Sequence, residues 1–257
     1  MSVNLIVDPQ KTTEQITKFI EQTVHNAGFS KVMVGLSGGI DSATSCTLAV
    51  RAIGQEKVFV GIFPYGDLNQ EGIKDARLLI NKLNIPQANM TLLDVKPLVE
   101  PIFNLDKTMD NLRRGNIMAR MRMILLYDLA KKQQALVLGT ENKTEHLLGY
   151  FTRFGDEASD IEPIHHLYKT QVKQLASYLG VPEKIIDKVP TAGLWQGQTD
   201  EGEFGFSYEE ADQILHLFID QKKKREEIIK EGFTREIVDK VIQRLRDNEF
   251  KSKLPYV

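Results

Sequence analysis

Short, continuously apolar runs alternate with longer segments of helical periodicity through the first half of the chain, and this alternation limits the possible folds more than any other feature. The apolar runs lie at residues 32–36, 58–63, 90–95 and 135–138. Apolar residues at helical spacing precede or separate these runs, at residues 13–27, 43–53, 70–83 and 114–132. Strands that are apolar throughout are typical of a parallel sheet buried on both sides. We therefore predict an α/β fold in which helices cover both faces of a parallel sheet.

The rest of the sequence adds further helices and two long irregular segments. Residues 140–166 and 190–206 are rich in Gly, Asp, Glu, Thr and His, and irregular segments of this length are usually functional or disordered. Capping boxes are predicted to begin two helices, one at Thr12 with Gln15 and one at Ser207 with Glu210. Further helices are expected at 168–179 and from about 234 to 246. The length favours a single domain, residues 1–257, with a Rossmann-like sheet and a C-terminal helical extension.

Charge and cysteine content exclude several classes of protein. Lys and Arg number 33 and Asp and Glu number 35, so the net charge of −2 gives no general attraction to nucleic acid or to an anionic membrane. Cys46 is the single cysteine, which excludes an internal disulfide and a multi-cysteine zinc site and fits a reducing compartment. The N-terminus lacks a signal-peptide pattern, and no apolar run is long enough to span a bilayer. We expect a cytoplasmic protein.

A glycine-rich loop joins the first predicted strand to the helix that follows it. Ligands of open parallel sheets bind beyond the carboxyl ends of the strands, glycines allow close backbone approach, and the N–H groups that begin a helix favour an anion. A phosphate group is therefore the expected ligand. The loop lacks the lysine of a Walker A motif and the G-x-G-x-x-G spacing of a dinucleotide fingerprint. Its sequence is Gly35-Leu36-Ser37-Gly38-Gly39-Ile40-Asp41-Ser42.

Two other interpretations explain the residues of this loop less completely than a phosphate site does. Gly35, Ser37 and Gly39 match the G-x-S-x-G nucleophile elbow of serine hydrolases, but a single helix precedes the strand and no His-Gly-Gly-Gly oxyanion loop lies upstream. A plain tight turn explains the glycines and leaves Ser37, Asp41 and Ser42 unexplained. A carboxylate repels phosphates unless a hard cation lies between them, so Asp41 indicates Mg²⁺.

The Ser-Gly-Gly-x-Asp-Ser sequence of the loop resembles the pyrophosphate-binding loop of the N-type ATP pyrophosphatases. Four further segments resemble, in order, the sequence blocks of NAD synthetases within that superfamily: residues 116–123, 138–145, 149–156 and 190–201. The resemblance extends over essentially the whole chain. It implies an ATP- and Mg²⁺-dependent ligase that amidates deamido-NAD through an acyl-adenylate intermediate and releases AMP and pyrophosphate.

The resemblance also assigns roles to individual residues. Asp41 and Lys169 would be catalytic, and the carboxylates of Asp41 and Glu145 would bind Mg²⁺. ATP would contact the loop at residues 35–42 together with Thr140, Lys169 and Thr191. Deamido-NAD would contact Arg120, Arg153, Asp160, Phe250 and Lys251. Two departures stand out: Phe250 occupies a position that is histidine in many relatives, and residues 157–159 lack the usual glycine pair.

The nitrogen donor and the assembly follow from the same resemblance. Glutamine-dependent relatives carry an additional amidase domain with a catalytic cysteine, and this chain has neither the length nor a spare cysteine for one. Ammonia is therefore the expected donor. A homodimer is implied, for which apolar residues of the long helix are candidates either for the interface or for the core: Ile117, Met121, Ile124 and Leu125.

Two other functions stay open at this point. One is another N-type ATP pyrophosphatase, such as a tRNA thiolase or an amidotransferase synthetase subunit, although the net charge and the single cysteine disfavour a thiolase. The other is a non-catalytic adenylate-binding regulator, which would not need Glu145 and Lys169. Outside this chemistry, the His165-His166 pair lacks the helical spacing of metal ligands and is interpreted as a surface or supporting pair. Cys46 is interpreted as a small core residue.

Overall fold

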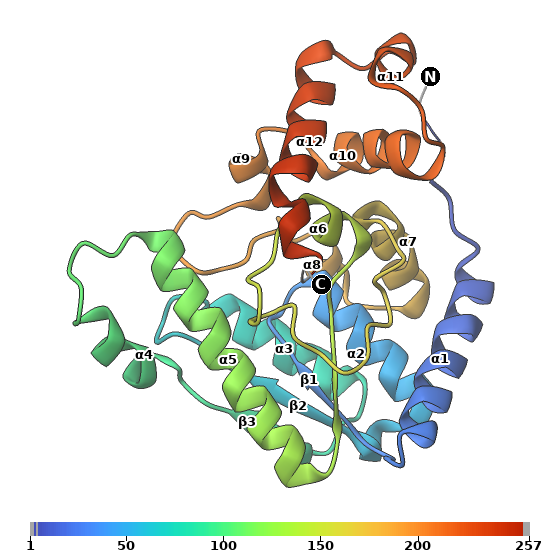
Figure 1. The fold of residues 1–257 in the computed structure, drawn as a ribbon. Coiled ribbons are helices and arrows are strands. Elements are labelled where there is room, and N and C mark those ends of the chain that lie inside the picture. The colour runs from blue at the N-terminus through green and yellow to red at the C-terminus, as the bar shows by residue number, and fades with distance from the viewer. Residues whose placement is uncertain (1–2, 4, 254–257) are drawn as a thin grey trace, which may run out of the picture.

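The structure is a computed structural model that describes residues 3 and 5–253, and within them a parallel sheet forms the centre of the molecule (Figure 1). Its strand order is β3-β2-β1-β4, and every pairing is parallel. Each predicted apolar run forms one strand, in most cases shorter by one to three residues at its carboxyl end. The strands are β1 (Val32–Gly35), β2 (Val58–Ile62), β3 (Met90–Leu92) and β4 (Leu136–Leu138). The predicted α/β class and parallel sheet are confirmed.

The helices include every one that periodicity predicts and several that it does not. Those in the first half are α1 (Pro9–Asn26), α2 (Ile40–Ile53), α3 (Gln70–Lys82), α4 (Lys96–Phe103) and α5 (Asn111–Gln133). Those in the second half are α6 (Lys143–Leu148), α7 (Lys169–Leu179), α8 (Glu183–Ile186), α9 (Asp200–Phe204), α10 (Tyr208–Leu215), α11 (Arg225–Lys230) and α12 (Arg235–Asn248). Short helices α6 and α9 therefore lie inside the two segments expected to be irregular.

The start of α1 differs from the prediction. The helix begins at Pro9, and Asp8 caps it by accepting a hydrogen bond from the Lys11 backbone N–H at 3.0 Å. Aspartate at the N-cap followed by proline in the first turn is a strong start signal. The predicted capping box at Thr12 and Gln15 is therefore wrong, because both residues lie inside the helix. The predicted box at Ser207 and Glu210 is confirmed.

Alternate residues of the strands pack into two separate hydrophobic cores, one on each face of the sheet. Val32 and Val34 of β1 pack into the core formed with α1, α2, α3 and α7. Met33, which lies between them, packs on the other face with Val137 of β4 and Leu129 of α5. This division is the covering of both faces that the continuous apolar runs predict.

The C-terminal helices form a separate layer that packs on α6 and α7 (Figure 1). Its core joins residues of α10 and α12, such as Ile214 and Val241, to Leu148 of α6 and Tyr168. Since α6 follows the carboxyl end of β4, this layer lies beside the edge of the sheet where ligands are expected. None of the helices within residues 3 and 5–253 combines the length and apolarity needed to cross a lipid bilayer.

Candidate active site

The loop between β1 and α2 leads into a helix start that no side chain caps. Gly39 is the N-cap of α2 and no side chain caps the helix, so N–H groups of its first turn are left for a ligand. The Ser37 hydroxyl accepts a hydrogen bond from the Gly39 N–H at 3.2 Å and lies 3.2 Å from the Ser42 hydroxyl. Gly38 has a φ of +81° and packs directly against Gly72 at the start of α3. These contacts fix the shape of the loop.

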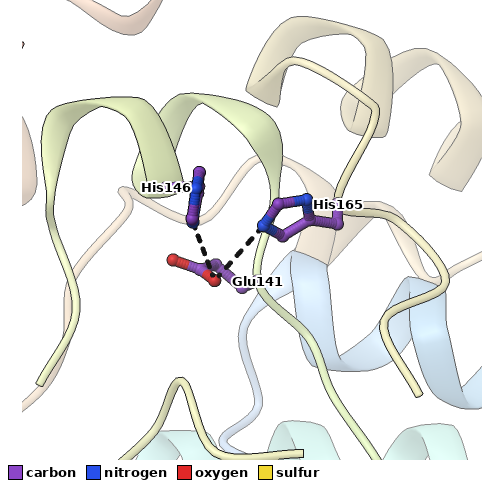
Figure 2. Close-up of side chains that lie close together, drawn as sticks. All are labelled: Glu141, His146 and His165. Atoms are coloured by element: carbon purple, nitrogen blue, oxygen red, sulfur yellow. Dashed lines mark ion pairs between the residues drawn. The ribbon is translucent and has the colours of Figure 1, made fainter. Parts of the chain in front are cut away.

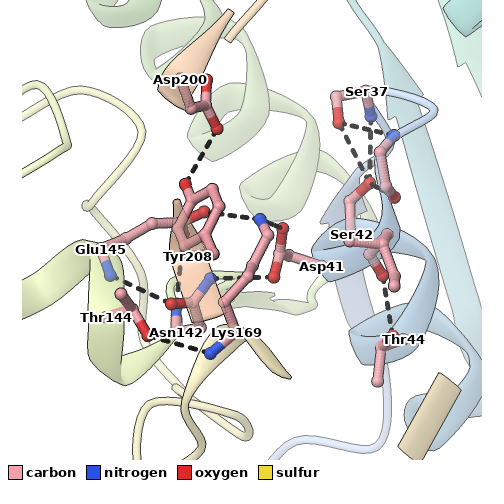
Figure 3. A network of polar contacts seen from close by, with 12 residues as sticks. Ser37, Asp41, Ser42, Thr44, Asn142, Thr144, Glu145, Lys169, Asp200 and Tyr208 are labelled. Atoms are coloured by element: carbon pink, nitrogen blue, oxygen red, sulfur yellow. Dashed lines mark hydrogen bonds and ion pairs between the residues drawn. The ribbon is translucent and has the colours of Figure 1, made fainter. Parts of the chain in front are cut away.

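Three of the predicted site residues converge beside this loop (Figure 3). The Lys169 ammonium donates to Asp41 Oδ2 at 2.5 Å and to Glu145 Oε1 at 2.9 Å. Asp41 lies in the first turn of α2, Glu145 in α6, and Lys169 is the first residue of α7. Lys169 and Asp41 are 128 residues apart in sequence, so the fold alone brings them together.

The convergence creates a buried cluster with an excess of negative charge. Lys169 is 8% exposed, yet the carboxylates of Asp41 and Glu145 outweigh the effect of its burial and hold its pKa above the ordinary value. Burial and the charge of Asp41 raise the pKa of Glu145. Asp200, 4% exposed, lies close enough to interact with the Lys169 charge. Three carboxylates thus surround one ammonium group.

Sequence reasoning missed four residues of this cluster, one of them Asp200 itself. The Asn142 amide donates to Asp41 Oδ1 at 2.9 Å, and the hydroxyls of Tyr150 and Tyr208 donate to Asp200 at 3.0 and 2.9 Å. A signal existed for Asn142, because Asn142 and Glu145 have capping-box spacing and form that box in the structure. The tyrosines lie in different segments, and no spacing links them.

The donor atoms of the cluster fit a hard divalent cation. Asp41 and Glu145 present carboxylate oxygens to a single cationic centre, the Lys169 ammonium. Carboxylate oxygens from separate segments, completed by phosphate oxygens, are the ligand type that Mg²⁺ accepts.

The residues predicted to bind deamido-NAD lie in two parts of the chain, one within residues 120–160 and the other near the C-terminus at residues 250 and 251. Arg120 on α5 donates through Nε and Nη2 to the Arg153 backbone carbonyl at 3.3 and 3.1 Å, so these two arginines are neighbours. Asp160 is exposed, and its carboxylate accepts the Val137 N–H of β4 at 2.7 Å. Near the C-terminus, Phe250 is 63% exposed.

Lys251 and the two predicted threonines complete the predicted set. The Lys251 ammonium donates to the backbone carbonyls of Gly149 and Phe151 at 2.6 and 3.2 Å, which ties the C-terminal segment to the turn after α6. Thr140 follows Gly139 directly beyond the carboxyl end of β4. Thr191 is exposed in the loop before α9 and accepts the Gly193 N–H at 3.0 Å. Nothing in the described residues joins Thr191 to the Lys169 cluster.

The geometry gives no support to a nucleophilic hydrolase. Within the described residues the Ser37 hydroxyl contacts Ser42 and Gly39, and no histidine is among its partners. Cys46 is completely buried, and that burial raises its thiol pKa to about 12, which leaves the nucleophilic thiolate unpopulated at neutral pH. The interpretation of Cys46 as a core residue is confirmed.

Asp212 on α10 contacts residues adjacent to the Lys169 cluster, and its titration allows the effect of burial on stability to be tested. It is fully buried and accepts hydrogen bonds from the hydroxyl of Thr144 and from the N–H and hydroxyl of Thr170 at 2.5, 2.8 and 2.7 Å. Thr144 and Thr170 are neighbours in sequence of Glu145 and Lys169. Burial raises the pKa of Asp212 to about 6, against the opposing effect of these donors.

An Asp212→Asn variant is expected to change both stability and its pH dependence. At pH 7 the asparagine side chain places an N–H donor where one carboxylate oxygen of Asp212 accepts hydrogen bonds. We expect this change to lower the free energy of unfolding by about 2 kcal/mol. Because the native pKa of Asp212 lies above its ordinary value, the wild type gains stability from this group as pH falls from about 6 to about 4. The variant lacks that gain, so urea denaturation at several pH values should show the difference widening at acid pH. A constant difference would contradict the burial effect.

Fold and site together define an α/β protein with a glycine-rich loop at the carboxyl end of β1 and a carboxylate–lysine cluster beside it. The chain matches the NAD synthase family over residues 12–255 and belongs to that family. It is 44% identical to the NH₃-dependent NAD⁺ synthetase of Chlorobaculum parvum, over 93% of this chain and 85% of the relative.

Solved structures agree with this assignment. An NH₃-dependent NAD synthetase from Campylobacter jejuni superposes with a TM-score of 0.82 at 33% identity, covering 98% of this chain and 99% of that one. An NMN synthetase from Francisella tularensis superposes with a TM-score of 0.85, with the same identity and coverage. The family predicted from the sequence blocks is confirmed.

Proposed function

We propose that this protein catalyses the ATP-dependent amidation of deamido-NAD to NAD with ammonia as the nitrogen donor. The observation that carries the proposal is the convergence of Asp41, Glu145 and Lys169 beside the glycine loop in a chain of the NAD synthase family. The high coverage of ammonia-dependent relatives favours this function over a tRNA thiolase, an amidotransferase synthetase subunit or a non-catalytic regulator.

The phosphates of ATP would be bound where the α2 N-terminus and the loop present their N–H groups. Lys169 lies close enough to this turn, through its contact with Asp41 in the first turn of α2, to add a positive charge there. We infer that Asp41 and Glu145 hold Mg²⁺, which would neutralise phosphate charge during adenylation. Thr140 and Thr191 are further proposed ATP contacts.

Deamido-NAD would be bound by residues of α5, the turn after α6 and the C-terminal segment. Arg120 and Arg153 lie side by side and supply cations for a pyrophosphate linkage. Asp160 and Lys251 are proposed to contact the same substrate. Phe250 carries no hydrogen-bonding side chain, so its proposed contribution is limited to packing on the substrate.

The proposed reaction uses positioning and charge stabilisation instead of a protein nucleophile. The nicotinate carboxylate attacks the α-phosphorus of ATP, forms an acyl adenylate and releases pyrophosphate. Ammonia then adds to the acyl carbon, and AMP leaves as the amide forms and a proton is lost. The Lys169 ammonium and the Mg²⁺ proposed at Asp41 and Glu145 would suit the first step, because negative charge moves from the carboxylate to the leaving pyrophosphate.

The direct test is to incubate the protein with ATP, Mg²⁺, ammonium and deamido-NAD. We expect AMP, pyrophosphate and NAD to form in equal amounts, with no product when deamido-NAD is omitted. Formation of ADP, or ATP turnover that is indifferent to deamido-NAD, would contradict the proposal.

A second substrate belongs in the same assay. The similarity to the Francisella tularensis NMN synthetase is as extensive as that to the Campylobacter jejuni enzyme, so the mononucleotide counterpart of deamido-NAD is a reasonable competitor. We expect a higher kcat/KM for the dinucleotide, because the curated relatives are NAD⁺ synthetases. A preference for the mononucleotide would move the proposed product from NAD to NMN.

Replacement of Lys251 by methionine is expected to raise the KM for deamido-NAD by about tenfold while kcat changes less than threefold. The substitution removes one cation from the proposed substrate site and the two hydrogen bonds that tie the C-terminal segment to Gly149 and Phe151. Steady-state kinetics with saturating ATP and ammonium measures both constants. An unchanged KM would remove Lys251 from the substrate site.

A homodimer and a cytoplasmic location are also proposed. Of the four candidate interface residues on α5, Ile117, Met121 and Leu125 pack against the cores, whereas Ile124 is 54% exposed. Leu112, at the start of the same helix, is 61% exposed. Sedimentation equilibrium should give the mass of two chains, and the mass of one chain would contradict the dimer. The location is supported by the single, unpaired cysteine.

A further inference from the structure

A second cluster of ligand-type side chains, formed by Glu141, His146 and His165, takes no part in the proposed active-site chemistry (Figure 2). His146 Nδ1 lies 3.5 Å from Glu141 Oε2, and His165 Nε2 lies 3.7 Å from the same oxygen. One potential ligand atom from each residue lies within 4.8 Å of the other two. Glu141 follows β4, His146 is on α6 and His165 precedes α7, so three segments contribute.

The polar atoms of this cluster lack the partners that burial normally requires. Glu141 is 7% exposed, and its Oε1 has no hydrogen-bond partner, nor has the buried Nδ1 of His146. Buried polar groups are rarely left unpaired, because each costs about 1–3 kcal/mol. No lysine or arginine is among the ion-pair partners of Glu141 within the described residues. The cluster is therefore short of a positive charge.

The spacing of the ligand atoms suits a small tetrahedral ion. Zinc bound at about 2.0–2.1 Å places neighbouring ligand atoms about 3.4 Å apart. Two of the three separations, 3.5 and 3.7 Å, are already close to that value. The imidazole rings of His146 and His165 stand edge to face, with their centroids 4.3 Å apart. Two imidazoles and one carboxylate form a ligand set that zinc accepts in proteins.

We propose that Glu141, His146 and His165 form a binding site for Zn²⁺ or a chemically similar transition-metal ion, with the fourth position open to water or a small ligand. The site is distinct from the Asp41–Glu145 pair, whose oxygen-only donors suit Mg²⁺. An ion here would join the segment after β4, α6 and the segment before α7. These segments carry Asn142 and Glu145 and lead directly into Lys169, the first residue of α7, so occupancy would stiffen the active-site cluster.

The sequence did not disclose this site because its ligands are not spaced as in a local motif. The sequence alone leaves His165 and His166 as a surface or supporting pair. His165 faces Glu141, whereas His166 is exposed. His166 therefore provides a matched control that differs from His165 by one position.

The test is titration of the metal-free protein with Zn²⁺ in excess Mg²⁺ and without nucleotide, followed by calorimetry and thermal denaturation. We expect one Zn²⁺ per chain at this site and an increase in Tm. Co²⁺ should give the visible absorption of a tetrahedral ion with nitrogen and oxygen ligands. Absence of binding, or an octahedral Co²⁺ spectrum, would overturn the proposal.

Single substitutions test which side chains bind the Zn²⁺ ion. His165→Gln and Glu141→Gln should each weaken Zn²⁺ binding by about a hundredfold, whereas His166→Gln and Asp41→Asn should retain it. Equal binding by His165→Gln and the wild type, or loss of binding in Asp41→Asn, would overturn the assignment. Circular dichroism checks that each variant is folded. If His165→Gln or Glu141→Gln does not fold, His146→Gln is used in its place. No readout depends on catalysis, so the result stands whether or not the proposed synthetase activity is found.

Discussion

A Lys169→Met variant is expected to lose about 10³-fold in kcat/KM and about 3 kcal/mol in the free energy of unfolding. Activity falls because the cation proposed to meet the ATP phosphates is removed. Stability falls because two carboxylates, Asp41 and Glu145, lose the ammonium that both contact. Removing one partner of a buried ion pair leaves charge without compensation. Steady-state kinetics and urea denaturation measure the two effects.

Magnesium should restore stability to this variant without restoring its activity. In the wild type the Lys169 ammonium lies between the two carboxylates proposed to bind Mg²⁺. Methionine leaves both carboxylates free, so millimolar Mg²⁺ is expected to raise the Tm of the variant more than that of the wild type. An equal Mg²⁺ effect on both proteins would contradict the proposed metal role of Asp41 and Glu145.

Lys188→Met is the matched control for these measurements. Lys188 also pairs with a buried carboxylate, that of Asp75, at 2.8 Å, and Asp75 is 1% exposed. Lys184 remains within 3.0 Å of Asp75 when Lys188 is replaced. We expect a smaller loss of stability, kcat/KM within about threefold of the wild type, and no stabilisation specific to Mg²⁺.

The sequence predicts the parts of this protein that depend on local patterns. Continuous apolar runs indicated a parallel sheet, and such a sheet gathers the segments after its strands at one edge. That geometry explains why Asp41 and Glu145, assigned from separate sequence blocks, lie around Lys169. The resemblance to a known family assigned roles to these residues, and the topology of the parallel sheet explains why they lie close together.

What the sequence does not predict depends on packing between distant segments. Asp200 is held by Tyr150, which is 50 residues away, and Glu141 faces His165 across a turn of irregular backbone. No periodicity or spacing encodes such contacts. The start of α1 differs in kind, because the local Asp8-Pro9 signal lies before the first apolar residue of the amphipathic pattern.

A Gly38→Ala variant is expected to lose about 3 kcal/mol of folding free energy and most of its affinity for ATP. Gly38 has a φ of +81°, a conformation that costs an alanine about 1 kcal/mol. In addition, a Cβ at this position would lie 2.3 Å from the Gly72 carbonyl oxygen and 2.6 Å from the Gly72 Cα. Those atoms belong to backbone at the start of α3, so the overlap is relieved only if the loop or the helix moves.

Gly28→Ala separates the steric contribution from the backbone strain. Gly28, just after α1, has a similar φ of +78°, but a Cβ there would meet nothing within 4 Å. We expect this variant to lose only about 1 kcal/mol and to bind ATP normally. Urea denaturation and calorimetric ATP titration of both variants measure the difference. If Gly38→Ala and Gly28→Ala lowered the folding free energy equally, the contact between the glycine loop and α3 would not determine the shape of the phosphate site. A larger loss at Gly38 that includes ATP affinity would establish that the close approach of Gly38 to Gly72 sets the loop for its ligand.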